Sequence, residues 1–158
     1  MGRLENERGS EMQRQRLACI FAVAAGSTLV AWASSWSHPD TFGVFSESTL
    51  IILLSAAVGG AIAGTLFRPA TEMFDWSWFV SFAFAIATLF IAATAGGFLL
   101  GILISVDAGA LRSMKLGFFF SIAALFYLGT AAMKPIGIFA IGLHILLIHL
   151  TAKRLDRF

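Results

Sequence analysis

The stretch WSWFVSFAFAIATLFIAATAGGFLLGILISV, residues 76–106, contains no Asp, Glu, Lys or Arg. As one continuous helix it would be about 46 Å long, whereas the hydrocarbon layer of a membrane is about 30 Å thick and needs roughly 20 apolar residues. Further uncharged runs occupy residues 17–39, 48–67, 116–133 and 135–152. The sequence therefore predicts an all-α, polytopic transmembrane bundle.

Composition and charge support the same fold class. The 158 residues are 58% hydrophobic and 13% charged, whereas about a quarter of the residues in a soluble domain are charged. We divide the chain into a polar cytoplasmic tail (1–16), a helical bundle (17–152) and a short basic tail (153–158). The net charge is +2, and acidic and basic residues alternate in the first tail, so we expect no nucleic-acid partner. The expected partners are the lipid bilayer and other membrane subunits or further copies of this chain.

Proline-containing breaks and charges set the expected helix boundaries. Proline disfavours helix in the residue before it, so Pro39, Pro69 and Pro135 separate helices, and Lys134-Pro135 predicts a tight hairpin between the last two. The expected helices cover residues 17–36, 48–67, 76–106, 116–133 and 136–151.

Three local features are expected around the long third helix. Asp75 is placed to cap its start, and Gly96-Gly97 is its most flexible point because glycine weakens a helix. Asp107, Arg112 and Lys115 are expected to form a polar connection to the next helix.

The preferred topology has five spans, with a cytoplasmic N-terminus in the cell membrane and termini on opposite sides. Residues 37–47 contain no Lys or Arg, which indicates an external loop. The alternative has four spans, with one of the last two runs re-entrant or lying on the surface, and brings the C-terminal basic residues inside. A cleaved signal peptide ending near Ala33 is a rival interpretation of the first run, but 23 uncharged residues favour a permanent span.

Small residues recur every four positions in two predicted helices, which places each set on one helix face. Transmembrane helices pack closely through such faces. We expect them to serve packing within the bundle, with a subunit interface as the alternative. The positions are Ala56, Gly60 and Gly64 in the second helix and Ala93, Gly97 and Gly101 in the third.

Polar candidates inside the predicted spans are few. His144 and His149 are five positions apart, about 140° around a helix, and so do not form an i, i+4 metal pair. We predict a hydrogen-bonded packing role for His144, with ligand binding or proton transfer as the alternative. For His149 we predict a position at the membrane interface. Arg68 and Glu72 are expected to pair across one helical turn, with an anionic headgroup or substrate site as the alternative. We predict no catalytic residue, metal site or cofactor.

Two function classes follow from these patterns. The absence of charge within the spans and the small-residue faces favour a non-catalytic accessory or assembly subunit of a larger membrane complex. The alternative is a small homo-oligomeric channel or carrier for a neutral or weakly polar solute. An enzyme is the least favoured class, because no constellation of catalytic residues is recognisable.

Overall fold

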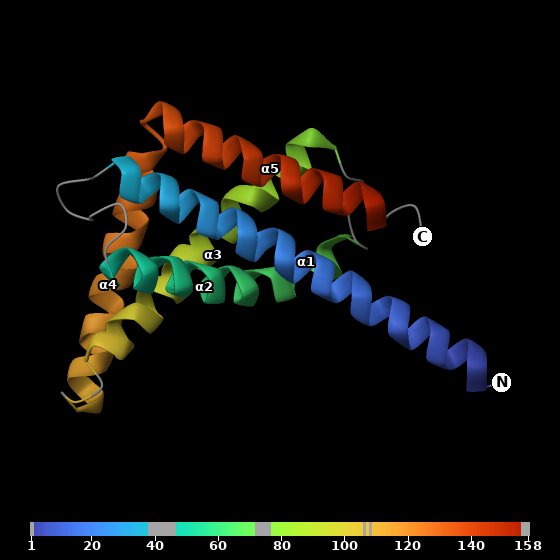
Figure 1. The fold of residues 1–158 in the computed structure, drawn as a ribbon, viewed down its shortest axis with the longest axis horizontal. Coiled ribbons are helices and arrows are strands. Elements are labelled where there is room, and N and C mark those ends of the chain that lie inside the picture. Colours follow the sequence, from blue (N-terminus) through green and yellow to red (C-terminus); the bar gives the residue numbers. More distant parts are fainter. Residues whose placement is uncertain (1, 38–46, 72–76, 106, 108, 156–158) are drawn as a thin grey trace.

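The computed structural model describes residues 2–37, 47–71, 77–105, 107 and 109–155. Each of the five long helices contains a segment of 19 to 27 residues that is apolar enough to cross a membrane. The structure thus confirms an all-α bundle of five helices with the length and composition of membrane spans, and the chain is a multi-pass membrane protein. The helices are α1 (Gly2–Ser37), α2 (Glu47–Thr71), α3 (Trp78–Ile104), α4 (Ala110–Ala131) and α5 (Pro135–Leu155) (Figure 1).

Helix α1 joins the polar N-terminal segment to the first apolar run. It has 36 residues and is about 54 Å long at 1.5 Å per residue. The part that precedes the apolar run projects beyond the other helices (Figure 1). Residues 2–16 are therefore a helical extension of the first span.

Helix α3 is shorter than expected but has no break. Ser77 is its N-cap, and the Ser77 hydroxyl accepts a hydrogen bond from the Val80 amide at 3.3 Å. Asp75, the expected cap, lies outside the described residues. The helix continues through Gly96 and Gly97, both buried.

Helix α4 begins earlier than the sequence indicated. Gly109 has a φ of +87°, a left-handed conformation that favours glycine, and it allows the chain to turn directly into a helix at Ala110. Arg112 and Lys115 are consequently exposed residues of α4. Their expected place in a polar connection was wrong.

Helices α1 and α5 pack side by side in opposite directions (Figure 1). Gly26, near the middle of the apolar segment of α1, lies against His144 of α5. Before Gly26 along α1, Cys19 and Val23 share a buried cluster with Ile148 and Ala152; after Gly26, Val30 and Ala33 share one with Ala140. The described start of α1 and the described end of α5 consequently lie at the same end of the molecule (Figure 1), and the sides of the membrane on which the termini lie stay a prediction.

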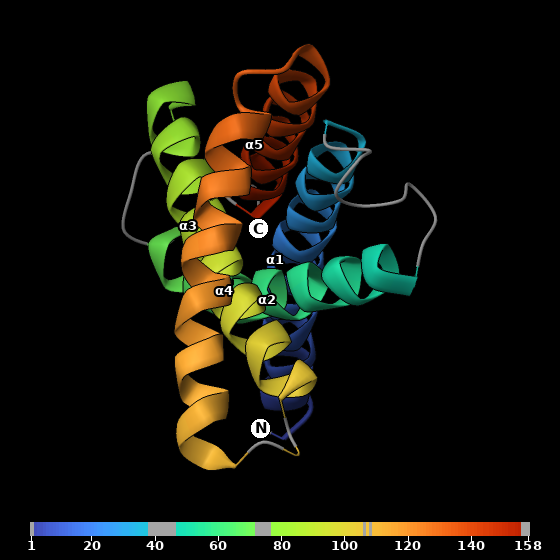
Figure 2. The same ribbon diagram turned by 90° about the vertical axis from the view of Figure 1, so that its left-hand side faces the viewer.

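The last two helices do not form the expected hairpin. The turn between Ala131 and Pro135 is tight, with the Lys134 amide donating to the Ala131 carbonyl at 3.0 Å. Before the turn, α4 packs along α3. After the turn, α5 diverges from α4 and packs on α1 (Figure 2). Gly137 lies against Ala131 at the turn, whereas Ala140 packs with Val30 and Ala33 of α1. Packing on α1 therefore accompanies the direction that α5 takes after the turn.

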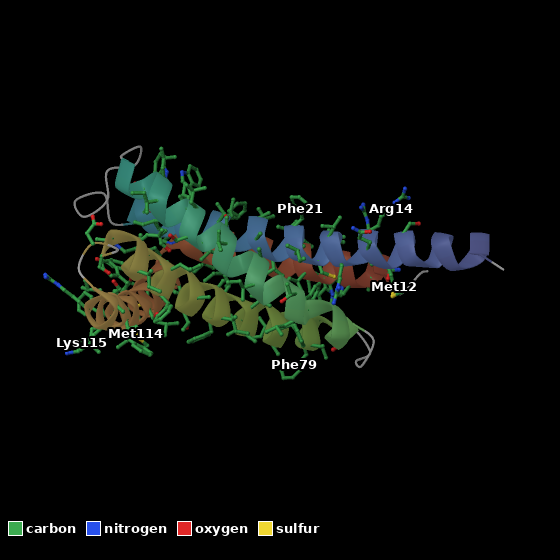
Figure 3. The ribbon with its side chains drawn as sticks, turned by 90° about the horizontal axis from the view of Figure 1, so that it is seen from below. Met12, Arg14, Phe21, Phe79, Met114 and Lys115 are labelled. Carbon is green, nitrogen blue, oxygen red and sulfur yellow. The ribbon has the colours of Figure 1, made fainter. Side chains whose placement is uncertain are left out.

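Many large apolar side chains of the bundle are exposed on its outer surface. Phe21 of α1 and Phe79 of α3 are 71% and 79% exposed, and they point outwards on different sides (Figure 3). Arg14 lies towards one end of the molecule and Lys115 at the other (Figure 3). A hydrocarbon layer would cover such phenylalanines and leave both charged groups near its surfaces.

Candidate ligand-binding cavity

A cavity of about 390 Å³ lies among α1, α2, α3 and α4. Small residues from all four helices, including Ala31, Ala56, Ala93 and Ala123, form much of its wall. Phe119 and Phe120 of α4 form an aromatic wall. Its volume falls within the range of small-molecule sites, roughly 300 to 1,000 Å³.

Two serines of the cavity wall have buried hydroxyls that lack hydrogen-bond partners among the described protein atoms. Ser27 of α1 and Ser55 of α2 are 4% and 6% exposed, and their Oγ atoms are buried. Serines in apolar helices usually donate to the carbonyl four residues earlier, as Ser34 does to Val30 at 2.8 Å and Ser35 to Ala31 at 3.1 Å. A buried hydroxyl without a partner costs about 1 to 3 kcal/mol. Both Oγ atoms are enclosed by protein atoms, and Ser27 Oγ lies in the contact between α1 and α2, 2.9 Å from where a Cβ on Gly60 would be.

The cavity lies between two helices that barely touch. Ile52 and Ser55 belong to the α2 wall, and Phe119 and Tyr127 to the α4 wall, yet α2 and α4 have hardly any direct contact. Both walls belong to segments apolar enough to span a membrane. The gap between these walls therefore lies at the depth of the hydrocarbon layer.

The electrostatic character of the cavity limits what it can hold. Among the described residues that line it, none is acidic, basic or a histidine. An ionised group buried there would lose its hydration without gaining a counter-charge, which is costly. The cavity therefore suits a neutral molecule.

The six small residues singled out from sequence occupy two kinds of position. Gly60 and Gly64 lie against α1: a Cβ on Gly60 would be 2.8 Å from Ala24 Cα, and one on Gly64 would be 2.7 Å from Ile20 Cα. Gly97 and Gly101 lie equally close to α4. Ala56 and Ala93 line the cavity, and so does Gly97. Close packing and the cavity thus share the same faces of α2 and α3.

His144 is completely buried between helices. Its Nε2 atom lies 3.1 Å from the hydroxyl oxygen of Thr88 on α3, and its ring lies against Gly26 on α1. Its Nδ1 atom has no hydrogen-bond partner among the described protein atoms. The ring packs beside the cavity but is not part of its lining.

His149 is 3% exposed and also contacts α3. Its Nδ1 atom lies 2.8 Å from Ser81 Oγ, and its ring stacks on Trp78 with centroids 3.9 Å apart. Both histidines of α5 consequently contact α3, although they do not share one narrow face of their own helix.

The expected Arg68–Glu72 pair stays a prediction. Arg68 belongs to α2, but the position of its side chain is outside the described part of the structure, as is Glu72. Among the described residues, no group of three His, Cys, Asp or Glu side chains is arranged to hold a metal ion.

Sequence reasoning missed Ser27 and Ser55. Serine is common in apolar helices, and nothing in the sequence distinguishes these two from Ser34 and Ser35, which bond to their own helix. Comparisons with protein families, curated proteins and solved structures found no match to this chain. Any functional argument therefore starts from the cavity.

Proposed function

We propose that this multi-pass membrane protein binds and carries a small neutral or weakly polar molecule in the cavity among α1, α2, α3 and α4. The observation that supports this is a cavity of about 390 Å³ among four membrane-spanning helices, with no charged side chain among the described residues that line it. Most of the cavity wall is apolar, as in typical small-molecule sites. A cytoplasmic N-terminus in the cell membrane, expected from the charge pattern, belongs to this proposal.

The test is to identify small molecules that stay bound when the protein is purified from its membrane. Purified wild-type protein is extracted with organic solvent, and neutral compounds are measured by mass spectrometry. Ala93→Phe places an aromatic ring in the cavity wall, whereas Ala87→Phe makes the same change at an exposed position of α3. We expect a neutral compound at about one copy per chain in wild type and Ala87→Phe, and its loss from Ala93→Phe. Equal retention by the two variants would contradict the proposal.

An accessory or assembly subunit is the second candidate. Gly129 on α4 and Gly142 on α5 have no neighbouring atoms where a Cβ would lie, so these small residues are available for close approach by another helix. Co-purification from native membranes tests this role. A stoichiometric partner that is lost on Gly129→Leu or Gly142→Leu, in a protein that retains no small molecule, would favour the accessory role.

A further inference from the structure

We infer that the cavity among α1, α2, α3 and α4 holds one hydrocarbon chain of a bilayer lipid, whose headgroup stays outside the protein. This inference rests on the proposed function, because it names what the same cavity binds: the neutral chain of a lipid. It adds that no polar group is recognised inside the cavity, that one chain fills it, and that the chain enters from the side of the bundle.

The wall of the cavity gives a ligand few hydrogen bonds. Ser34 and Ser35 donate to carbonyl oxygens of their own helix, at 2.8 and 3.1 Å. The Oγ atoms of Ser27 and Ser55 are enclosed by protein atoms, which puts them out of a ligand's reach. Tyr127 has the remaining hydroxyl among the described lining residues. A polar molecule would lose hydrogen bonds to water on entering such a site, whereas a hydrocarbon chain has none to lose.

The depth of the cavity in the membrane favours lipid chains over water-soluble molecules. The lining residues on all four helices lie within segments that are apolar enough to cross a membrane. At that depth the surrounding medium consists of the hydrocarbon chains of lipids. The wall of an empty cavity lacks dispersion contacts, and a chain that enters from the bilayer supplies them.

The volume of the cavity fits one chain. At about 30 Å³ for each water-sized group, a cavity of about 390 Å³ holds on the order of a dozen methylene groups. The two chains and the headgroup of a whole phospholipid need more space than this. One chain therefore enters, and the headgroup keeps its hydration at the membrane surface.

The loosest part of the cavity wall is on the side of α4. Gly60 of α2 packs closely on α1, Gly59 of α2 packs closely on α3, and Gly97 of α3 packs closely on α4. Helices α2 and α4 hardly touch each other, although both line the cavity, which is partly open to its surroundings. A chain consequently enters sideways where these two helices stand apart, without leaving the hydrocarbon layer.

Photolabelling in phosphatidylcholine vesicles tests the inference. The probe is a phosphatidylcholine that carries a diazirine in one chain, and labelled residues are mapped by mass spectrometry of peptides. Phe21 and Phe79 point outwards and give the reference labelling of the lipid-facing surface (Figure 3). We expect labels also on Ile52 and Phe120, half-buried residues of the cavity wall. An excess of dodecane should remove these wall labels, and an excess of glycerol should leave them unchanged.

Filling the cavity distinguishes a bound chain from lipid on the outer surface. Ala93→Leu and Ala93→Phe reduce the space in two steps, whereas Ala87→Phe adds a ring at an exposed position of the same helix. Labelling of Ile52 and Phe120, relative to that of Phe79, should fall with Ala93→Leu and be lost with Ala93→Phe. It should stay at the wild-type level with Ala87→Phe.

Removing hydroxyls tests whether a polar group is recognised. Tyr127→Phe, and Ser34→Ala together with Ser35→Ala, should retain the labels on the cavity wall. Loss of these labels, with Phe79 labelled as in wild type, would show that a polar group of the ligand is bound. That result would overturn the inference, while a neutral compound that is lost with Ala93→Phe would still support the proposed function.

The remaining outcomes also distinguish this inference from the proposed function. If Ile52 and Phe120 are labelled equally in Ala93→Phe and Ala87→Phe, no lipid chain occupies the cavity and the inference is overturned. Extraction of a compound without a hydrocarbon chain, lost only with Ala93→Phe, would then leave the proposed function in place. A labelled cavity wall in a protein that retains no compound on purification would support the inference and contradict the proposed carrier role.

Discussion

The Oγ1 atom of Thr88 and the Nε2 atom of His144 lie 3.1 Å apart in the buried contact between α3 and α5. The Thr88 hydroxyl also donates to the Ala85 carbonyl at 3.0 Å. The Nδ1 atom of the same imidazole lies against Gly26 of α1. Helices α3 and α1 thus contact the two nitrogen atoms of one imidazole ring, and Gly26 provides the space for the ring.

Gly26→Ala is expected to destabilise the bundle by about 1 to 3 kcal/mol, the usual cost of overpacking a buried site. The added Cβ would collide with the His144 ring, which is held by Thr88. Equilibrium unfolding in mixed detergent micelles measures the change. Gly142→Ala is the matched control, because open space surrounds that position, and it should be neutral or stabilising by up to about 1 kcal/mol. Equal destabilisation by both variants would contradict the packing described for Gly26.

Replacing His149 by a residue without a ring should lower the free energy of unfolding more than replacing it by an apolar residue with a ring. His149→Ala removes the ring stacked on Trp78, with an expected cost on the order of 2 to 4 kcal/mol. His149→Phe keeps a stacked ring, and Ser81 keeps its hydrogen bond to the Ser77 carbonyl at 3.1 Å, so the cost should stay below about 1.5 kcal/mol. The same unfolding measurement compares the two, and a phenylalanine variant as unstable as the alanine variant would show that the hydrogen bond to Ser81 matters more than the stack.

The glycine face of α2 is expected to be more sensitive than a neighbouring face. Gly60→Leu together with Gly64→Leu would force α1 and α2 apart, because both glycines approach the α1 backbone closely. Ala57→Leu with Ala61→Leu makes the same change at positions that are partly exposed. Detergent melting should show a clearly lower transition temperature for the glycine pair. Similar melting of the two double variants would mean that the glycine face has no special role in packing.

Both ends of the chain are expected on the same side of the membrane. Helices α1 and α5 pack in opposite directions, so the described start of α1 and the described end of α5 lie at one end of the molecule, and α4 runs across the direction of these two helices (Figure 1). Single cysteines at Ser10, Lys115 or Lys153, in a Cys19→Ala background, can be tested with a membrane-impermeant thiol reagent in sealed vesicles. We expect Ser10→Cys and Lys153→Cys to react from one side and Lys115→Cys from the other. Labelling of the Ser10 and Lys153 positions from opposite sides would show that α1 and α5 are not paired as described.

The sequence by itself determined the helices of this protein. Runs without charged residues are long enough to cross hydrocarbon, and their composition leaves no polar coat for a soluble core, so the all-α membrane bundle follows from length and hydropathy. The break at Lys134-Pro135 was also predictable, because proline disfavours helix in the preceding residue. The early start of α4 was not, since it depends on the positive φ of Gly109.

Tertiary structure decided which helices meet and what lies between them. Periodicity places Gly60 and Gly64 on one face but cannot say that α1 covers that face. It cannot pair Thr88 with His144, 56 positions apart, nor send α5 back along α1. The cavity is least accessible to sequence reasoning, because Ser27 and Ser55 differ from Ser34 and Ser35 only in hydrogen bonding. The physical reason is that hydropathy is a property of each segment, whereas closeness of approach and satisfaction of buried polar atoms are properties of the pairs of helices that pack together.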